Sequence, residues 1–218
     1  MATPNQAALE YRKSTAREYF ESICVAVILA LFVRTFIVQA FKIPSGSMEN
    51  NLLIGDHLLV NKFAYAPTLT GIERAVLPID TIHRGEILVF KYPEDPERDF
   101  IKRVIALPGE TIELKQKRVY IDGTKLDEPY VHYLSPPDEE GGDEFDVRVQ
   151  YGPVTVPPGH LFMMGDNRDN SQDSRYWGFL PQEYVKGKAL FIYFSFGEGG
   201  LMDLVPGVRW SRIFHQIH

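Results

Sequence analysis

One long apolar run near the N-terminus constrains the fold of this 218-residue chain more than any other feature. Residues 23–38 read ICVAVILALFVRTFIV, and Arg34 is the single charge among them. The uninterrupted part, 23–33, is shorter than the roughly 20 residues that cross a bilayer. A span must therefore continue through Arg34, whose long side chain can reach the interface, to about Phe41. The sequence predicts a membrane anchor over residues 22–41, with a buried core helix as the alternative.

The residues around this run predict whether it is cleaved and how it is oriented in the membrane. No small-x-small cleavage site precedes Ile43, which favours an anchor that is kept over a signal peptide that is removed. Three cations precede the run closely and one follows it, namely Arg12, Lys13 and Arg17 before and Lys42 after. Because positive flanks stay in the cytoplasm, we expect residues 1–21 to be cytoplasmic and everything from Ile43 onward to lie across the membrane.

Composition excludes two classes of function. The net charge of −6 and the scattered Lys and Arg residues argue against a nucleic-acid-binding surface. The only cysteine, Cys24, lies inside the apolar run, which excludes a Cys-dependent enzyme and an intrachain disulfide. With 44% hydrophobic residues, the chain is typical of one globular domain with an appendage.

After residue 42 the sequence predicts a mainly β domain. Short segments rich in β-branched or aromatic residues alternate with Gly, Pro and Asp-Gly signals. The predicted strands are 57–63, 86–92, 100–107, 111–114, 118–121, 147–151, 160–164 and 190–194. Residues 113–122 indicate a β-hairpin followed by a turn at Asp122-Gly123, and the acidic stretch 135–146 indicates a solvated loop.

Residues 43–48, IPSGSM, form a turn that favours chemistry over packing. Pro44 fixes its own φ and biases Ile43 toward extended backbone, while Gly46 permits conformations closed to other residues. Ser45 and Ser47 are thus held on a shaped turn that can present a hydroxyl to a substrate. A Ser-rich turn that caps the next helix is the alternative.

The stretch 99–109, DFIKRVIALPG, places two cations inside an apolar strand. Side chains alternate along a strand, so Lys102 and Arg103 face opposite sides, and we expect at least one to be partly buried. Burial lowers the pKa of a lysine, which makes Lys102 a candidate general base. Arg103 stays protonated and is expected to donate to a structural ion pair. The alternative is that Lys102 extends to solvent.

Residues 165–178, GDNRDNSQDSRYWG, predict a rigid polar loop. Asp, Asn, Ser and Arg side chains can bind the loop's own backbone and each other, and such loops often build active sites. A calcium loop using Asp166, Asp169 and Asp173 is the competing interpretation. It lacks the EF-hand spacing, and two arginines would oppose a cation.

Together these stretches resemble the bacterial type I signal peptidases, a family of serine endopeptidases with a Ser/Lys dyad. Four motifs occur in the family's order: PSGSM at 44–48, GDHLLVNKF at 55–63, FIKRVIALPGE at 100–110 and GDNRDNSQDSRYWGFLP at 165–181. The chain departs from the family after Met48, where Glu49-Asn50-Asn51-Leu52 replace the usual x-Pro-Thr-Leu.

The resemblance assigns roles to individual residues. Ser47 would be the nucleophile, and Lys102 the general base that takes its proton. Ser45 and the backbone N–H of Ser47 would bind the oxyanion, and Ser171 would orient the lysine. Two larger sets are implied: structural support from Arg103, Asp166, Asp173 and Arg175, and pockets for small side chains lined by Ile43, Pro44, Met48, Leu52, Phe100 and Ile101.

The resemblance also implies the setting of the reaction. The enzyme would sit in the bacterial inner membrane and cut preproteins that emerge from the export translocon, after an Ala-x-Ala sequence. No metal or cofactor would be needed. The fold would be a β-rich core with a small inserted β cap, here at 113–151, within a catalytic domain at 42–198.

Residues 199–218 predict an amphipathic C-terminal tail. Trp210, Ile213, Phe214 and Ile217 are spaced as on one face of a helix. We expect this helix to lie in the membrane interface beside the active site, or else to pack on the β core.

Two other functions stay open on the sequence. A Ser/His hydrolase would need a histidine beside Ser47, and the candidates are His57, His83, His132 and His160. A membrane-tethered β domain that only binds partners would explain the anchor and the strands without needing Ser47.

Overall fold

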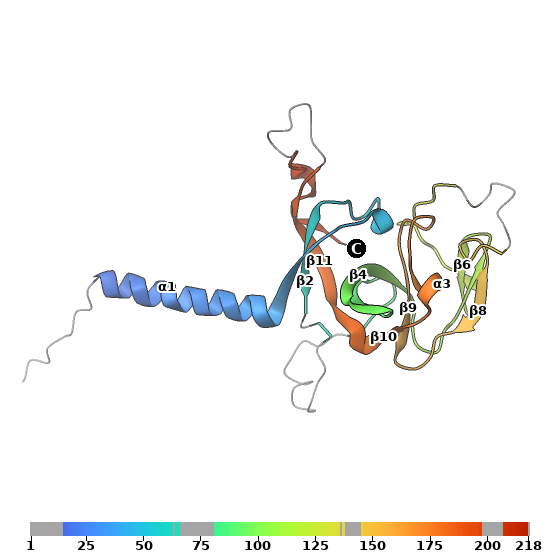
Figure 1. The fold of residues 1–218 in the computed structure, drawn as a ribbon, viewed down its shortest axis with the longest axis horizontal. Coiled ribbons are helices and arrows are strands. Elements are labelled where there is room, and N and C mark those ends of the chain that lie inside the picture. The colour runs from blue at the N-terminus through green and yellow to red at the C-terminus, as the bar shows by residue number, and fades with distance from the viewer. Residues whose placement is uncertain are drawn as a thin grey trace, which may run out of the picture. The chain divides into compact units, whose positions relative to one another are not determined.

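The computed structural model describes residues 15–62, 64–65, 81–135, 137, 145–197 and 207–217 (Figure 1). It divides into two units, Met1–Ile37 and Val38–His218.

The first unit contains one long helix. Helix α1 (Thr15–Phe32) continues as a π-helical turn, η1 (Val33–Ile37). Thr15–Ile37 is 23 residues long and contains an 18-residue window with a mean hydropathy of 2.2, which makes this the one helix in the described chain long and apolar enough to cross a membrane. At about 1.5 Å per residue it spans roughly 35 Å, slightly more than a bilayer's hydrocarbon core.

The predicted anchor limits, 22–41, are wrong at both ends. The helix already includes Thr15 and ends at Ile37. Residues Val38–Lys42 instead form strand β1, because their backbone groups pair with strand β2 (Asp56–Asn61), from Val38 opposite Asn61 to Lys42 opposite His57. Hydropathy alone could not separate the strand from the helix. Arg12 and Lys13 lie outside the described residues.

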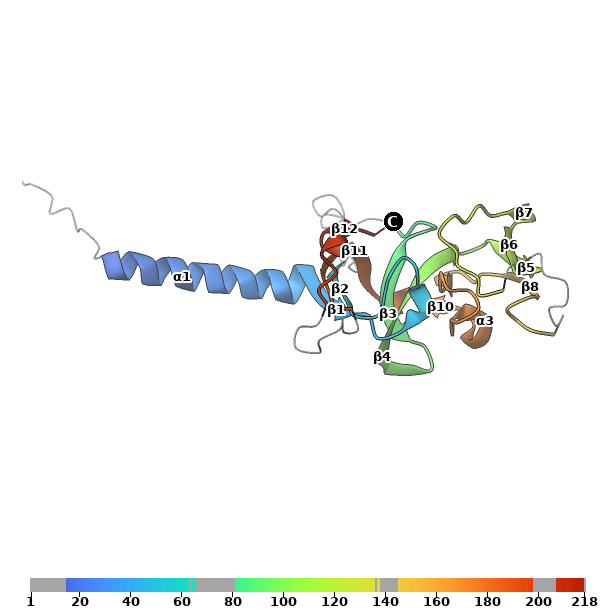
Figure 2. The same cartoon turned by 90° about the horizontal axis from the view of Figure 1, so that it is seen from above.

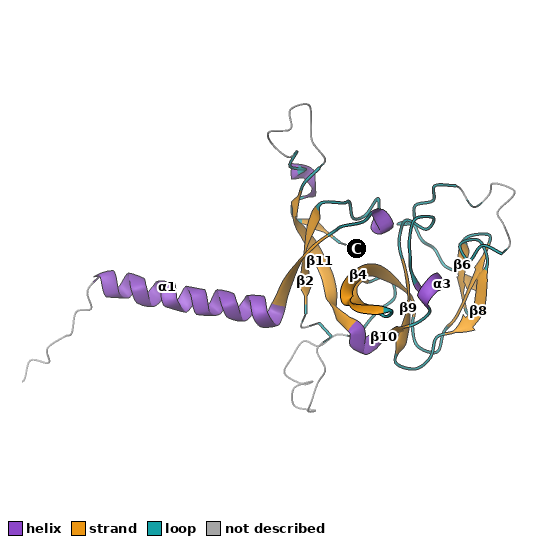
Figure 3. Ribbon diagram, viewed as in Figure 1, coloured by secondary structure: helices purple, strands orange, loops and turns teal. Residues whose placement is uncertain are grey.

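The second unit is mainly β, as the sequence predicts (Figure 3). An eight-stranded antiparallel sheet has the order β1-β2-β11-β3-β4-β9-β10, and β12 also pairs with β11. Its strands after β1 are β2 (Asp56–Asn61), β3 (Ile87–Tyr92), β4 (Asp95–Ala106), β9 (His160–Met164), β10 (Leu180–Pro181), β11 (Val185–Ser195) and β12 (His215–Gln216).

A second, four-stranded sheet is inserted between β4 and β9, with the order β7-β6-β5-β8. Figure 2 shows its strands grouped at one end of the unit. They are β5 (Thr111–Lys115), β6 (Arg118–Ile121), β7 (Thr124–Lys125) and β8 (Tyr151–Thr155). The predicted hairpin is confirmed by β5 and β6, and the turn after it has positive φ at Asp122 and Gly123, the region that Asp and Gly tolerate best.

The strand predicted at 147–151 is wrong. Val149 and Gln150 donate to the Asp146 carbonyl oxygen, and the Asp146 side chain accepts from the Arg148 N–H at 2.8 Å. These bonds fold residues 146–150 into a turn, so β8 begins only at Tyr151.

The C-terminal segment is not the predicted helix. Only Trp210–Arg212 form a short 3-10 turn, η4, and His215–Gln216 then pair with β11 as β12. Trp210 and Phe214 are largely exposed, while Ile217 packs against the core. The apolar spacing is helical, but ladder bonds to β11 hold the chain extended.

Candidate active site

The turn at 43–48 is fixed by backbone bonds on both sides. Ile43 donates to the Asp56 carbonyl oxygen at 2.8 Å and accepts from the Gly55 N–H at 3.1 Å. Gly46–Met48 form a 3-10 turn, η2, that places Ser47 in a buried position. Ser45 is its N-cap residue in extended conformation, but its hydroxyl makes no cap bond. The turn therefore leaves the Ser45 hydroxyl available for another acceptor.

Lys102 reaches Ser47 from strand β4. Its Nζ donates to Ser47 Oγ at 2.7 Å and to the Ile101 carbonyl oxygen at 3.0 Å, and its side chain is buried. Burial lowers the pKa of Lys102 to about 8, although the negative charges of Asp173 and Asp166 act in the opposite direction. A large fraction of this amine is thus neutral near pH 8, as a general base requires.

Arg103 lies on the other face of β4 and is buried in an ion pair. Its Nε and Nη2 donate to the two oxygens of Asp166 at 2.8 and 2.7 Å, and Nη1 donates to the Gly85 carbonyl oxygen at 2.6 Å. The guanidinium also lies 3.9 Å from the Tyr130 ring centroid. This bidentate geometry matches the expected structural role of Arg103.

The loop that follows β9 holds the nucleophile turn directly. The Asn167 N–H donates to the Ser47 carbonyl oxygen at 3.1 Å, and Asn167 Nδ2 donates to the Gly46 carbonyl oxygen at 3.1 Å. A Cβ at Gly165 would lie 2.4 Å from the Ser47 carbonyl oxygen and 2.3 Å from Ser171 Oγ, so only glycine permits this approach. Sequence reasoning gave neither Asn167 nor Gly165 a role, although both stand in the predicted polar loop.

Asp173 and Arg175 brace the far end of the same loop. Arg175 donates to both Asp173 oxygens at 2.8 Å, and Asp173 accepts from the Gly165 N–H at 3.1 Å. Asp173 also caps the short helix α3 (Ser174–Trp177). Burial pushes the pKa of Asp173 upward, but the charge and hydrogen bonds of Arg175 outweigh burial and lower the pKa overall. Both residues take the supporting position expected of them.

The carboxylates of the alternative calcium loop are already bound by cations. Asp166 pairs with Arg103, Asp169 with Lys117 at 2.9 Å, and Asp173 with Arg175. These ion pairs favour the scaffold interpretation of the loop.

One assigned contact differs from expectation. Ser171 is buried beside Gly165, but no hydrogen bond joins its hydroxyl to Lys102 in the described structure. The two acceptors that orient the amine are Ser47 Oγ and the Ile101 carbonyl oxygen.

Asn51 is a third residue that sequence reasoning missed. It occupies the position where the family usually has Thr, and its Nδ2 donates to Asp166 Oδ2 at 2.5 Å and to the Tyr130 carbonyl oxygen at 3.1 Å. Asn51 therefore ties the segment after the nucleophile to the Arg103–Asp166 ion pair. No feature of the sequence indicates this contact.

A cleft of about 620 Å³ opens beside the Ser47–Lys102 pair. Three of the expected pocket residues line it, namely Pro44, Phe100 and Ile101. The other three do not, because Ile43, Met48 and Leu52 are buried in a hydrophobic cluster with strand residues such as Leu58. An apolar side chain next to a catalytic turn can serve the core or the pocket, and sequence cannot tell which.

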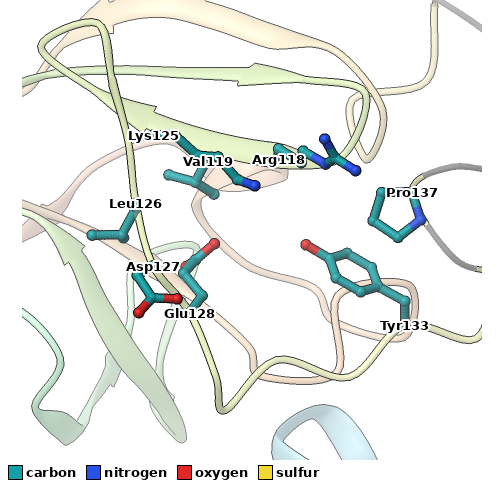
Figure 4. A pocket seen from close by; sticks show the side chains of 8 residues that line it. All are labelled: Arg118, Val119, Lys125, Leu126, Asp127, Glu128, Tyr133 and Pro137. Atoms are coloured by element: carbon teal, nitrogen blue, oxygen red, sulfur yellow. The ribbon is translucent and has the colours of Figure 1, made fainter.

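A second hollow, of about 340 Å³, lies against the small sheet (Figure 4). Arg118 and Lys125 stand on one side of it, and Asp127 and Glu128 on the other. Glu128 is already paired with Arg168. No serine or histidine lines this hollow, so the Ser47 cleft is the candidate active site.

The Ser/His alternative finds no support in the contacts of Ser47. Its Oγ is bound by Lys102, and no hydrogen bond joins it to a histidine within the described ranges. The four candidate histidines have contacts elsewhere: His57, His83, His132 and His160.

Comparison with known proteins decides the family. Residues 16–194 match the family model of signal peptidase, peptidase S26. This chain belongs to the signal peptidase I family. It is 36% identical to signal peptidase I of Pseudomonas aeruginosa over 97% of this chain and 84% of that protein. It is 33% identical to signal peptidase I of Aquifex aeolicus over 87% of this chain and 88% of that protein.

A solved signal peptidase I from Enterococcus faecalis is 34% identical, covering 50% of this chain and 97% of that chain with a TM-score of 0.41. The family model and the curated relatives show that the chain is a signal peptidase, a serine endopeptidase that removes signal peptides from preproteins, and a Ser/Lys dyad is the mechanism of this family. Its N-terminal helix is long and apolar enough to cross a membrane.

Proposed function

We propose that Ser47 is the nucleophile and Lys102 the general base with which this signal peptidase cuts preproteins. The observation that carries the proposal is the buried 2.7 Å contact between Lys102 Nζ and Ser47 Oγ. Burial also lowers the pKa of Lys102 to about 8, so the amine can accept a proton under mildly alkaline conditions.

In the first step, neutral Lys102 takes the hydroxyl proton while Ser47 Oγ attacks the carbonyl carbon of the scissile bond. The tetrahedral intermediate carries an oxyanion. Its donors are the Ser45 hydroxyl, which makes no cap bond, and the Ser47 N–H. Ser47 is the second residue of η2, and the first N–H groups of a helical turn have no acceptor within it.

The remaining steps return the enzyme to its starting state. The Lys102 ammonium gives its proton to the leaving amine, the C–N bond breaks, and the mature protein departs. The signal peptide remains as an ester on Ser47. Lys102 then deprotonates a water that attacks the ester, and Ser47 Oγ regains a proton as the acid product leaves.

Substrate selection by small residues follows from the cleft. Pro44, Phe100 and Ile101 line it beside the dyad, and inserting extra methylenes against packed side chains costs about 1–3 kcal/mol. We therefore assign an Ala-x-Ala preference to this site. Replacing the Ala before the scissile bond with Leu is expected to lower kcat/KM by roughly 5- to 150-fold, and equal values for both preproteins would contradict this preference.

We also propose a single-pass topology, with the N-terminus in the cytoplasm and the catalytic unit on the extracytoplasmic side. Arg12, Lys13 and Arg17 precede the apolar run in the sequence and only Lys42 follows it closely, so the support comes from this excess of cations before the run. Preproteins emerging from the translocon would then meet the cleft on that side. Protease added outside intact spheroplasts should degrade the catalytic unit, and protection of that unit would refute the topology.

A serine-reactive acylating probe tests the central assignment. The full chain in detergent should be labelled at Ser47, located by peptide mapping, and labelling should be lost in Ser47→Ala and strongly slowed in Lys102→Met. Single alanine variants of His57, His83, His132 and His160 should keep it. Labelling at another residue, or an unchanged rate in Lys102→Met, would overturn the dyad.

A further inference from the structure

The cleft extends from the dyad along β4, where residues 98–102 all line it. Arg98, Phe100 and Lys102 alternate along the chain, and all three line the cleft. Both cations lie near the Phe100 ring: Lys102 Nζ is 5.2 Å from its centroid and Arg98 Cζ is 5.6 Å from it. The guanidinium is therefore within roughly three to four residues of extended peptide from the reacting atoms, at about 3.3 Å per residue.

Two aromatic rings hold the Arg98 guanidinium in place. Tyr92 and Phe100 are stacked, with centroids 4.3 Å apart and ring planes at 9°, and Arg98 Cζ is 5.9 Å from the Tyr92 centroid. Arg98 is exposed, and none of its N–H groups donates to a residue in the described part of the chain. Its planar fork is thus positioned but unused, which suits bidentate binding of a carboxylate.

The charges of the other lining residues are compensated. Asp99 is paired with Lys186 at 2.7 Å, and Lys102 is neutral in the reacting form of the proposed mechanism. Asn170 and Gln172 carry no charge. Among the cleft residues, Arg98 therefore carries a positive charge that forms no ion pair within the described part of the chain, although Glu94 and Asp95 lie near the same Tyr92 ring.

We propose that Arg98 is a specificity-determining residue that binds an acidic side chain of the preprotein within about four residues of the scissile bond. The proposal rests on the proposed function, because Ser47 and Lys102 fix where the scissile bond lies. A preprotein with Glu at the matching position is cut faster than one with Lys there, by roughly three- to tenfold, the range of a partly screened ion pair.

The test uses the full-length enzyme in detergent and matched preproteins. Each preprotein carries Glu, Gln or Lys at one position among the four residues before and the four after the scissile bond, leaving the two small-residue positions intact. For each enzyme, kcat/KM on the Glu and Lys preproteins is divided by its value on the Gln preprotein. The enzymes are wild type, Arg98→Gln, Arg98→Glu and a control, Lys91→Glu, which makes the same charge change at an exposed residue of β3 outside the cleft lining.

We expect one position at which the Glu preference of the wild type disappears in Arg98→Gln, reverses in Arg98→Glu and persists in Lys91→Glu. Equal Glu-to-Lys ratios in wild type and Arg98→Glu at every position would overturn the inference. Reversal in Lys91→Glu as well would also overturn it, because a general field effect would then explain the preference. Cleavage of the Gln preproteins by Ser47→Ala would instead refute the proposed function itself.

Discussion

Lys102 and Arg103 are consecutive residues of β4, and both are buried. Their side chains have different partners, because they lie on opposite faces of the strand. On one face Lys102 contacts only neutral acceptors, Ser47 Oγ and the Ile101 carbonyl oxygen. On the other face Arg103 is bound by both oxygens of Asp166. Burial therefore lowers the pKa of the lysine, while the arginine keeps a charge that is fully paired.

The difference shows how the chain can hold a reactive amine inside an ordered core. The acidic side chains of the 165–175 loop bind arginines and a lysine away from the dyad, so they act on Lys102 only through space. An acid in direct contact with Lys102 would raise its pKa and keep it protonated. The loop thus positions the nucleophile turn through Asn167 without supplying that contact.

The largest effect should come from changing Lys102, the proposed general base. Lys102→Arg keeps the charge but removes the ability to lose a proton, so kcat/KM on a preprotein should fall by about 10²–10⁴ or more. Arg103→Lys serves as the matched change on the opposite face and should retain far more activity. Similar activities for the two variants would contradict the claim that the two faces of β4 have different roles.

The next effect concerns the face of β4 on which Arg103 is paired with Asp166, called the paired face below. Arg103→Met leaves a buried Asp166 carboxylate without its cation, and we expect the free energy of unfolding to fall by about 3–5 kcal/mol. Urea titration followed by tryptophan fluorescence measures it. Lys115→Met, which removes an exposed ion pair with Glu113, should cost less than about 1 kcal/mol. Equal losses for the two would mean that burial of the Arg103 pair has no energetic consequence.

Removing the Lys102 amine, which has no carboxylate partner among the described residues, should have a smaller effect of opposite sign on the free energy of unfolding. The pKa of Lys102 is about 8 in the fold and 10.5 ordinarily, so below pH 8 the lysine is protonated in both states and burying its charge costs up to about 3 kcal/mol. Between these pKa values the cost shrinks as pH rises, because the folded lysine is already neutral.

Lys102→Met should therefore raise the free energy of unfolding near pH 6, by up to about 3 kcal/mol less the two lost hydrogen bonds. The gain should decline toward about pH 10.5, where the lysine is neutral in both states. Urea titrations at several pH values measure it. A gain that grows with pH would have the wrong sign and would reject the lowered pKa.

The smallest effect should come from Asn51, which supports the paired face. Asn51→Ala removes the bond to Asp166 and should lower the free energy of unfolding by about 1 kcal/mol. The pH dependence of kcat/KM should stay unchanged, because Asn51 does not contact Lys102. A shifted pH profile in this variant would show that the two faces are coupled.

The sequence predicted the placement of the reactive residues better than the packing of the residues around them. The placement of Lys102 and Arg103 on opposite faces follows from strand alternation, and the contact of Lys102 with Ser47 matches the family resemblance. Sequence alone could not predict the burial of Met48 and Leu52, the lack of a hydrogen bond between Ser171 and Lys102 in the described structure, or the Asn51 contact. Each depends on which segments, distant in the sequence, pack against the turn.

The fold shows the same division. Strands β2 to β6, β9 and β11 stand out as apolar or β-branched runs, and the mainly β class is confirmed. Strands β1 and β12 escaped prediction because one adjoins an apolar helix and the other has helical apolar spacing. Both exist through pairing with the larger sheet, which is tertiary information.

The pH dependence of kcat/KM tests the central claim most directly, because it reports the titration of the free enzyme. On one preprotein and in one detergent, wild-type kcat/KM should rise between about pH 6 and pH 10 with an apparent pKa of about 8, that of buried Lys102. A value that is flat across this range, or a rise centred near the ordinary lysine pKa of 10.5, would contradict a neutral Lys102 acting as the base.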